Sequence, residues 1–89
     1  MEMVRKDIRV LSPEEIEVGK WYRAKDKRRT PRYVLYVSPD RGDVQFDGME
    51  VRLGQHYPHR SMDTFLRWCG GRAEVDSDGY PVKNGWGVE

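Results

Sequence analysis

The stretch Arg32-Tyr33-Val34-Leu35-Tyr36-Val37-Ser38 is the part of this 89-residue chain that does most to decide its fold. Aromatic and β-branched side chains fill it, and these residue types are enriched in β-strands. Because both of its faces are apolar, we expect a strand that is central in a sheet or covered on one side by another element. The turn residues that follow, Pro39-Asp40-Arg41-Gly42, predict a reversal of the chain.

Beyond that turn, Val44-Gln45-Phe46-Asp47-Gly48-Met49-Glu50-Val51 predicts a β-hairpin. An Asp-Gly dipeptide between two alternating runs favours a two-residue type I′ turn. With this dipeptide as the loop, Phe46 faces Met49 and the polar side chains pair on the opposite face. We expect the second strand of the hairpin to continue through Leu53.

Two elements are predicted on the N-terminal side. Trp21-Tyr22-Arg23-Ala24 is a plausible first strand. One helical turn over residues 13–18 should precede it, because Ser12 and Glu15 have the spacing of a capping box and Pro13 occupies the first helical position.

Two further elements are predicted on the C-terminal side. Ser61 is a suitable N-cap for a short helix or 3-10 turn over residues 61–68, which the dipeptide Gly70-Gly71 would end. The segment Arg72-Ala73-Glu74-Val75-Asp76 is a candidate last strand. From Ser77 onward the chain is rich in Gly and Asp.

Short strands at spacings of about ten residues, with a helical turn late in the chain, predict a mainly β fold. We expect a small SH3-like or Tudor-like antiparallel barrel or a curled meander, with one short helix or 3-10 turn near residues 61–68. An α+β roll is the alternative. The expected parts are an N-terminal arm with one helical turn (1–17), a small β-barrel domain (18–76) and a C-terminal tail (77–89). This tail should be mobile unless Tyr80 and Trp86 dock on the domain.

The formal net charge of the chain is only +1, but the charges are separated along it. Residues 1–19 carry a net charge of −2, residues 20–32 carry +6 and residues 33–89 carry −3. A compact cationic segment flanked by acidic segments is a candidate surface for an anionic partner.

The basic loop within residues 25–32, together with neighbouring tyrosines, is the candidate binding site. Cations on one connector suit phosphate groups, because each neutralised phosphate releases counterions. Tyrosines beside them can stack on unpaired bases. The alternative is a solvated loop whose tyrosines belong to the core, and the same cations also suit an acidic protein surface. The predicted site residues are Lys25, Lys27, Arg28, Arg29, Arg32, Tyr22, Tyr33 and Tyr36.

Aromatic residues are numerous for a domain of this size. They cannot all be central in one small core, so some should reach the surface, where Trp and Tyr are enriched at interfaces. The alternative is that they simply rim the core. The residues concerned are Trp21, Tyr22, Tyr33, Tyr36, Tyr57 and Trp68.

Other candidate chemistry is weaker. His56 and His59 would need a third ligand to hold a metal, and we interpret them as exposed or core-edge side chains. We interpret Cys69 as a small core residue rather than a nucleophile. A domain this small has little room for a catalytic cleft. We therefore expect a protein that is not an enzyme, with no catalytic residues, no metal and no cofactor.

Membrane insertion and secretion are not indicated. The longest apolar run covers residues 33–37, far short of a membrane span. The first residues, Met1-Glu2-Met3-Val4-Arg5-Lys6-Asp7, carry charges where a secretory signal has its apolar stretch. One cysteine permits no internal disulfide. We expect a cytoplasmic protein that contacts no membrane.

Four segments together resemble short phage and prophage proteins of unassigned function: Val18-Gly19-Lys20-Trp21-Tyr22-Arg23, the strand at 32–37, the hairpin at 44–51, and Ser61-Met62-Asp63-Thr64-Phe65-Leu66. The shared pattern is a Gly-x-x-Tyr opening, a curled meander and a Phe-containing last turn, over about residues 18–68. The resemblance implies an SH3-like fold and a role in a mobile element, and it defines no functional residue.

The function we expect is a non-enzymatic small binding domain that contacts nucleic acid through the basic loop and the adjacent aromatic residues. The alternative is a phage or mobile-element interaction protein that binds and inhibits a host defence protein. In that case the same loop would hold an acidic protein surface.

Overall fold

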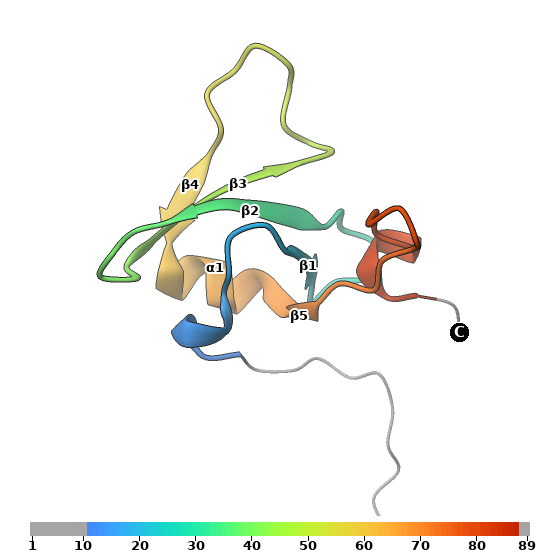
Figure 1. The fold of residues 1–89 in the computed structure, drawn as a ribbon, viewed down its shortest axis with the longest axis horizontal. Coiled ribbons are helices and arrows are strands. Elements are labelled where there is room, and N and C mark those ends of the chain that lie inside the picture. Colours follow the sequence, from blue (N-terminus) through green and yellow to red (C-terminus); the bar gives the residue numbers. More distant parts are fainter. Residues whose placement is uncertain (1–10, 88–89) are drawn as a thin grey trace, which may run out of the picture.

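A five-stranded antiparallel sheet dominates the computed structural model, which describes residues 11–87 (Figure 1). The strand order is β4-β3-β2-β1-β5, and within the described residues the outer strands β4 and β5 do not pair with each other. The sheet is therefore an open, curled meander, and the predicted mainly β fold class is confirmed. The strands are β1 (Trp21–Ala24), β2 (Arg32–Val37), β3 (Asp43–Gly48), β4 (His59–Ser61) and β5 (Cys69–Arg72).

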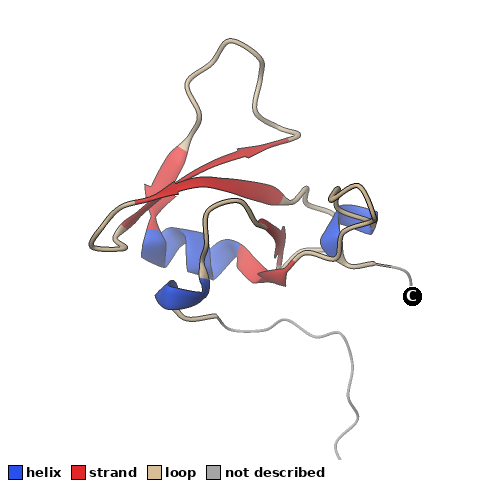
Figure 2. Cartoon of the chain, viewed as in Figure 1, coloured by secondary structure: helices blue, strands red, loops and turns tan. Residues whose placement is uncertain are grey.

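One α-helix, α1 (Met62–Trp68), connects β4 to β5 and packs under the sheet (Figure 2). Ser61 caps it as predicted, because its hydroxyl accepts a hydrogen bond from the Thr64 N–H at 3.2 Å. Two 3-10 turns flank the sheet in sequence, η1 (Pro13–Glu15) and η2 (Lys83–Gly85). The first is shorter than the predicted turn over 13–18, because the backbone at Ile16 is already extended.

The core lies between the inner face of the sheet and α1. Phe65 of α1 meets Tyr22 of β1 edge-on, with ring centroids 6.0 Å apart and planes at 81°. Leu11 and Ile16 also pack in this core, so the described part of the predicted N-terminal arm belongs to the domain; residues 1–10 of that arm lie outside the described residues. The buried cluster consists of Leu11, Ile16, Tyr22, Val34, Val44, Phe46, Met62, Phe65 and Cys69.

The predicted hairpin at residues 44–51 is wrong. β3 continues through Asp47 and Gly48, where Gly48 lies opposite Arg32 of β2. A long loop follows, and the strand that pairs with the other edge of β3 is β4. A Cβ at Gly48 would lie 2.9 Å from the carbonyl oxygen of Pro31. This glycine therefore permits close approach of the neighbouring backbone and does not form a tight turn.

The last strand begins three residues earlier than predicted, at Cys69 instead of Arg72. Gly70 and Gly71 lie inside this strand and do not end the helix, which stops at Trp68. A Cβ at Gly70 would lie 2.8 Å from the carbonyl oxygen of Ala24. Gly70 thus lets β5 lie close against its antiparallel neighbour β1. Residues 73–76 form only an isolated bridge, between Val75 and Pro81.

The C-terminal segment, residues 77–87, folds back beside β1 (Figure 1). Trp86 is 4% exposed, so the docking on which the prediction of a mobile tail depended is present. The Val82 N–H and the Glu74 carbonyl are hydrogen-bonded at 3.0 Å, and the Glu74 N–H donates to Gly85 at 2.7 Å. This segment brings the turn at residues 76–80 next to the sheet.

Candidate anion-binding groove

The basic loop is an ordered turn built around Asp26. Its carboxylate accepts two hydrogen bonds from the Arg28 guanidinium, both at 3.1 Å, and one from the Arg28 N–H at 2.9 Å. These bonds to Arg28 lower the pKa of Asp26 below its ordinary value. The positive charge of Arg28 is therefore already matched by a carboxylate, although its side chain is exposed.

Arg32, at the start of β2, is half-buried and stacked on the core. Its guanidinium carbon lies 4.3 Å from the ring centroid of Phe46 and 4.2 Å from that of Trp68. Burial, followed by the positive charges of Arg60 and Arg29, lowers the pKa of Arg32 to about 10, while Glu50 acts in the opposite direction. Arg32 remains a cation at neutral pH, and the neighbouring positive charges of Arg60 and Arg29 repel it.

Arg32 and Arg60 line one groove of about 220 Å³ at the open edge of the sheet. Arg60 lies on β4 opposite Val44, which is inward-facing, and Arg32 enters from β2 on the other side of β3. Phe46 of β3 forms the apolar floor between them. We call this cavity the arginine groove; it is lined by Thr30, Pro31, Arg32, Phe46, Gly48, Glu50, Val51, Gln55, His56, Pro58 and Arg60.

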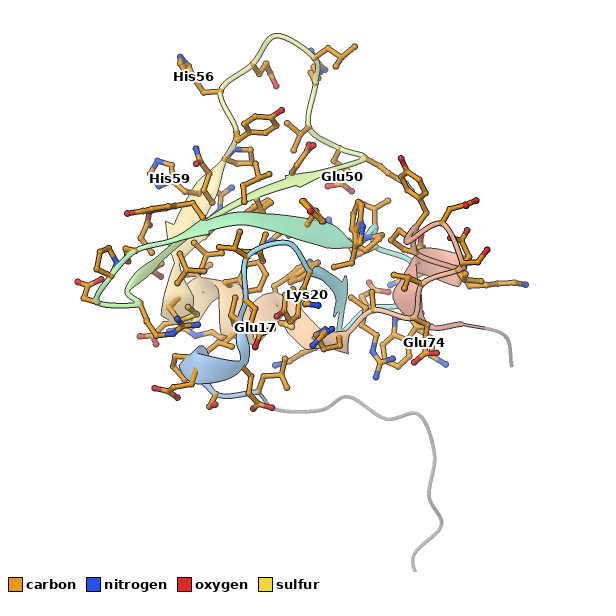
Figure 3. The ribbon with its side chains drawn as sticks, viewed as in Figure 1. Glu17, Lys20, Glu50, His56, His59 and Glu74 are labelled. Atoms are coloured by element: carbon orange, nitrogen blue, oxygen red, sulfur yellow. The ribbon has the colours of Figure 1, made fainter. Side chains whose placement is uncertain are left out.

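The loop of residues 49–58 forms the outer wall of the groove and projects from the sheet (Figure 3). His56 lies on this loop, and Glu50 lies near its beginning. Glu50 is the one carboxylate among the described lining residues. The groove is therefore lined by two guanidiniums, one imidazole and one carboxylate, a balance that favours an anionic ligand.

The three predicted tyrosines do not join the basic loop. Tyr22 is fully buried, and its hydroxyl is held by the Glu15 carbonyl and the Glu17 N–H, both at 2.8 Å, so its prediction as a base-stacking residue is wrong. Tyr33 and Tyr36 pair across the sheet with Asp47 and Gln45. A β-bulge between Val34 and Tyr36 shifts the register by one residue, so both tyrosines lie opposite residues that alternate with the buried Val44 and Phe46. Tyr33 and Tyr36 therefore share the outer face, opposite the core.

The predicted cations do not form one cluster. Arg29 and Arg32 contribute to the field of the groove. Arg28 is paired with Asp26, and Lys27 lies 5.0 Å from the Trp86 ring, on the side of the C-terminal segment. Lys25 is exposed at the end of β1, where its backbone N–H donates to the Trp68 carbonyl at 2.9 Å.

Sequence reasoning missed Arg60, the second guanidinium of the groove. The hairpin prediction assigns the partner of β3 to residues 49–53, and Pro58, which has no backbone N–H to donate in a sheet, argues against a strand over residues 56–60. No local pattern marks His59-Arg60-Ser61 as the strand β4, because its three side chains are polar and exposed and Ser61 is also the N-cap of α1.

The remaining polar candidates do not form a reactive cluster. Among residues 11–87, no group of three or more His, Cys, Asp or Glu side chains is arranged to hold a metal ion. His59 Nδ1 lies 3.4 Å from a carboxylate oxygen of Asp43 on the neighbouring strand. Cys69 is buried in the core, as predicted, and burial raises the pKa of its thiol.

Comparison of the chain with protein-family models, with curated proteins and with solved structures finds no match. No helix within the described part of the chain is long and apolar enough to cross a membrane.

Proposed function

We propose that this chain is a small, non-enzymatic nucleic-acid-binding domain that holds a backbone phosphate in the arginine groove. The observation that carries the proposal is the convergence of Arg32 and Arg60 on one cavity from the two strands that flank β3. Two guanidiniums with fixed fork geometry suit the oxygens of a phosphate.

The charges around the groove support this proposal. Arg32 has its pKa lowered by burial and by the neighbouring charges of Arg60 and Arg29. An anion placed between these groups relieves their mutual repulsion, so that binding gains both from direct contact and from released counterions. Phe46 and Val51 add apolar walls, against which a sugar or base can pack.

The site differs from the one expected from the sequence in a way that an experiment can resolve. Arg28 and Arg29 are neighbours in sequence with the same charge, but Arg28 is paired with Asp26 and only Arg29 acts on Arg32. Arg28 therefore serves as a matched control for Arg29 and Arg60.

The experiment measures affinity for single- and double-stranded DNA and RNA of mixed sequence across a salt series. We expect R29A and R60A each to weaken binding and to reduce the slope of log K against log salt by about 1, whereas R28A leaves the slope nearly unchanged. Absence of binding to all four nucleic acids at about 50 mM salt, where phosphate contacts are strongest, would refute the proposal. Equal effects of R28A and R60A would refute the groove as the site.

A second candidate function is that of a phage or mobile-element interaction protein, which binds and inhibits a defence protein of the host. The observation in its favour is the projecting loop of residues 49–58, where Leu53 is fully exposed, Met49 is 65% exposed and Tyr57 is 45% exposed. Exposed apolar side chains on one loop favour a protein contact. If a protein partner binds this loop, L53D should abolish its binding and R60A should leave it unchanged. The opposite pattern would show that the partner binds the arginine groove instead.

A further inference from the structure

A second cavity, of about 380 Å³, lies on the outer face of the sheet, away from the arginine groove. Trp21 of β1, Tyr33 of β2 and Asp47 of β3 lie opposite one another in the sheet and form a continuous row across three strands. Their side chains share the outer face because their neighbours Tyr22, Val34 and Phe46 face the core. This row is the floor of the cavity.

The C-terminal segment provides the facing wall through Asp78, Gly79 and Tyr80. The turn that carries them is held by Asp76, whose carboxylate accepts from the N–H groups of Asp78 and Tyr80 at 2.9 and 3.0 Å. The Asp76 N–H donates to the Tyr80 carbonyl at 2.8 Å. Tyr80 is 63% exposed, so its ring is available to a ligand.

The cavity is aromatic on several sides and acidic. Trp21 and Tyr33 are tilted against each other at 57° with centroids 5.2 Å apart, and both residues line the cavity as adjoining walls. Tyr80 forms a third wall, and Asp47 and Asp78 contribute carboxylates. None of the described residues that line this cavity is basic. Faces of aromatic rings carry negative electrostatic potential and attract cations, most strongly for Trp.

We propose that this cavity, the aromatic cage of Trp21, Tyr33 and Tyr80, binds a methylated ammonium cation. Methyl groups spread the charge over an apolar surface that packs against the rings, and they leave few N–H donors to be hydrated. The two carboxylates supply attraction at longer range. The same carboxylates repel phosphate, so a nucleotide is disfavoured here even though bases can stack on aromatic rings. The cage is independent of the function proposed for the arginine groove.

Two sources share this chemistry: the side chain of a methylated lysine in a protein and a small free quaternary ammonium such as choline. The probes are therefore choline, a short peptide with trimethyllysine, the same peptide with unmodified lysine, and 3,3-dimethyl-1-butanol, which has the shape of choline without its charge. Binding is followed in the full chain by NMR, through the indole N–H signal of Trp21.

We expect choline and the trimethyllysine peptide to shift the Trp21 indole signal and to bind about tenfold more tightly than the neutral alcohol or the unmodified peptide. Tighter binding of the peptide than of choline would identify a protein source, and equal or tighter binding of choline would identify a small cation. Both results support the cage.

The variant Y80A tests the third wall, because an exposed side chain can be removed without loss of the fold. We expect Y80A to weaken choline binding about tenfold, and D78N to weaken it less. Y36A is the matched control, since Tyr36 lies on the same face of the sheet but does not line the cavity. Equal binding of choline and the neutral alcohol, an unshifted Trp21 signal, or equal effects of Y36A and Y80A would overturn the proposal.

Discussion

The Arg23 guanidinium lies over the ring of Trp86, 4.2 Å from its centroid. Arg23 belongs to β1 and Trp86 follows η2, so this contact attaches the C-terminal segment to the sheet 63 residues away in sequence. Arg23 is 9% exposed, and its Nε also donates to the Gly70 carbonyl at 3.3 Å. The segment that carries Tyr80 is therefore anchored through the interior of the domain.

The first prediction concerns this anchor. W86A should lower the free energy of unfolding by roughly 3–5 kcal/mol, because it removes a large buried side chain and leaves Arg23 without the ring that covers it. Thermal or urea unfolding measures the change. Y80A, on the same segment but exposed, should stay within about 0.5 kcal/mol of the wild type. If W86A and Y80A are equally stable, the Trp86 anchor does not contribute as argued.

The second prediction concerns the buried hydroxyl of Tyr22, which bridges the Glu15 carbonyl and the Glu17 N–H. Y22F keeps the ring but removes both hydrogen bonds, so part-buried backbone groups lose their partner. We expect a loss of about 1–3 kcal/mol in urea unfolding. The control is Y36F on the exposed outer face, where removal of a hydroxyl should have little effect. Similar losses in Y22F and Y36F would contradict the bridging role.

The elements that the sequence predicted correctly depend on local signals. The β-branched and aromatic run at β2 and the Ser61 cap of α1 act through a few neighbouring residues, and the structure confirms both. The errors occur where contacts with residues distant in sequence determine the local structure. Asp47-Gly48 has the composition of a hairpin turn, but Gly48 lies against Pro31, and pairing of β3 with β2 outweighs the local turn preference.

Each of the two cavities likewise combines residues that the sequence indicates with residues that only the tertiary structure brings to the site. Arg29 and Arg32 belong to a cationic segment that is evident in the sequence, whereas Arg60 comes close to them only because β4 pairs with β3. Trp21 and Tyr33 are recognisable as aromatic residues, but their neighbour Tyr80 depends on the docking of Trp86. No periodicity or composition reports contacts over such separations, so the sites could be predicted only in part.

The third prediction is a pH dependence from the turn at Asp40. Its carboxylate accepts from the Gly42 N–H at 2.9 Å and the Ser38 hydroxyl at 2.8 Å, and these bonds lower the pKa of Asp40 below its ordinary value. A lowered folded-state pKa contributes stability that is present above the unfolded pKa of about 4 and is lost as the pH falls through the folded value.

We therefore expect D40N to be less stable than the wild type at pH 7 and to approach it as the pH falls through the lowered folded-state pKa, where the wild-type carboxyl becomes protonated. Melting temperatures across a pH series from 7 downward measure the difference. D63N, in which an exposed acidic residue of α1 is neutralised, is the control for a general effect of charge. If the difference in melting temperature between D40N and the wild type stays constant across this pH range, the Asp40 carboxylate is not the origin of the pH dependence.

The fourth prediction tests the close crossing of β5 and β1. A Cβ at Gly70 would lie 2.8 Å from the Ala24 carbonyl oxygen and 3.1 Å from the Lys25 Cα, both backbone atoms that cannot rotate away. G70A should therefore destabilise the domain by about 1–3 kcal/mol, the usual cost of overpacking. It should also weaken the protection of the Lys25 N–H, which donates to Trp68 beside this crossing, in hydrogen exchange.

G54A is the matched control for this substitution. Gly54 has a positive φ of 84°, but a Cβ there would meet no atom within 4 Å. Its cost is that of backbone conformation alone, about 1 kcal/mol, and it should leave the Lys25 N–H as protected as in the wild type, apart from the global change. Because the two variants add the same methyl group, a local loss of protection in G70A alone identifies the steric crossing as its cause. Equal protection in both would contradict it.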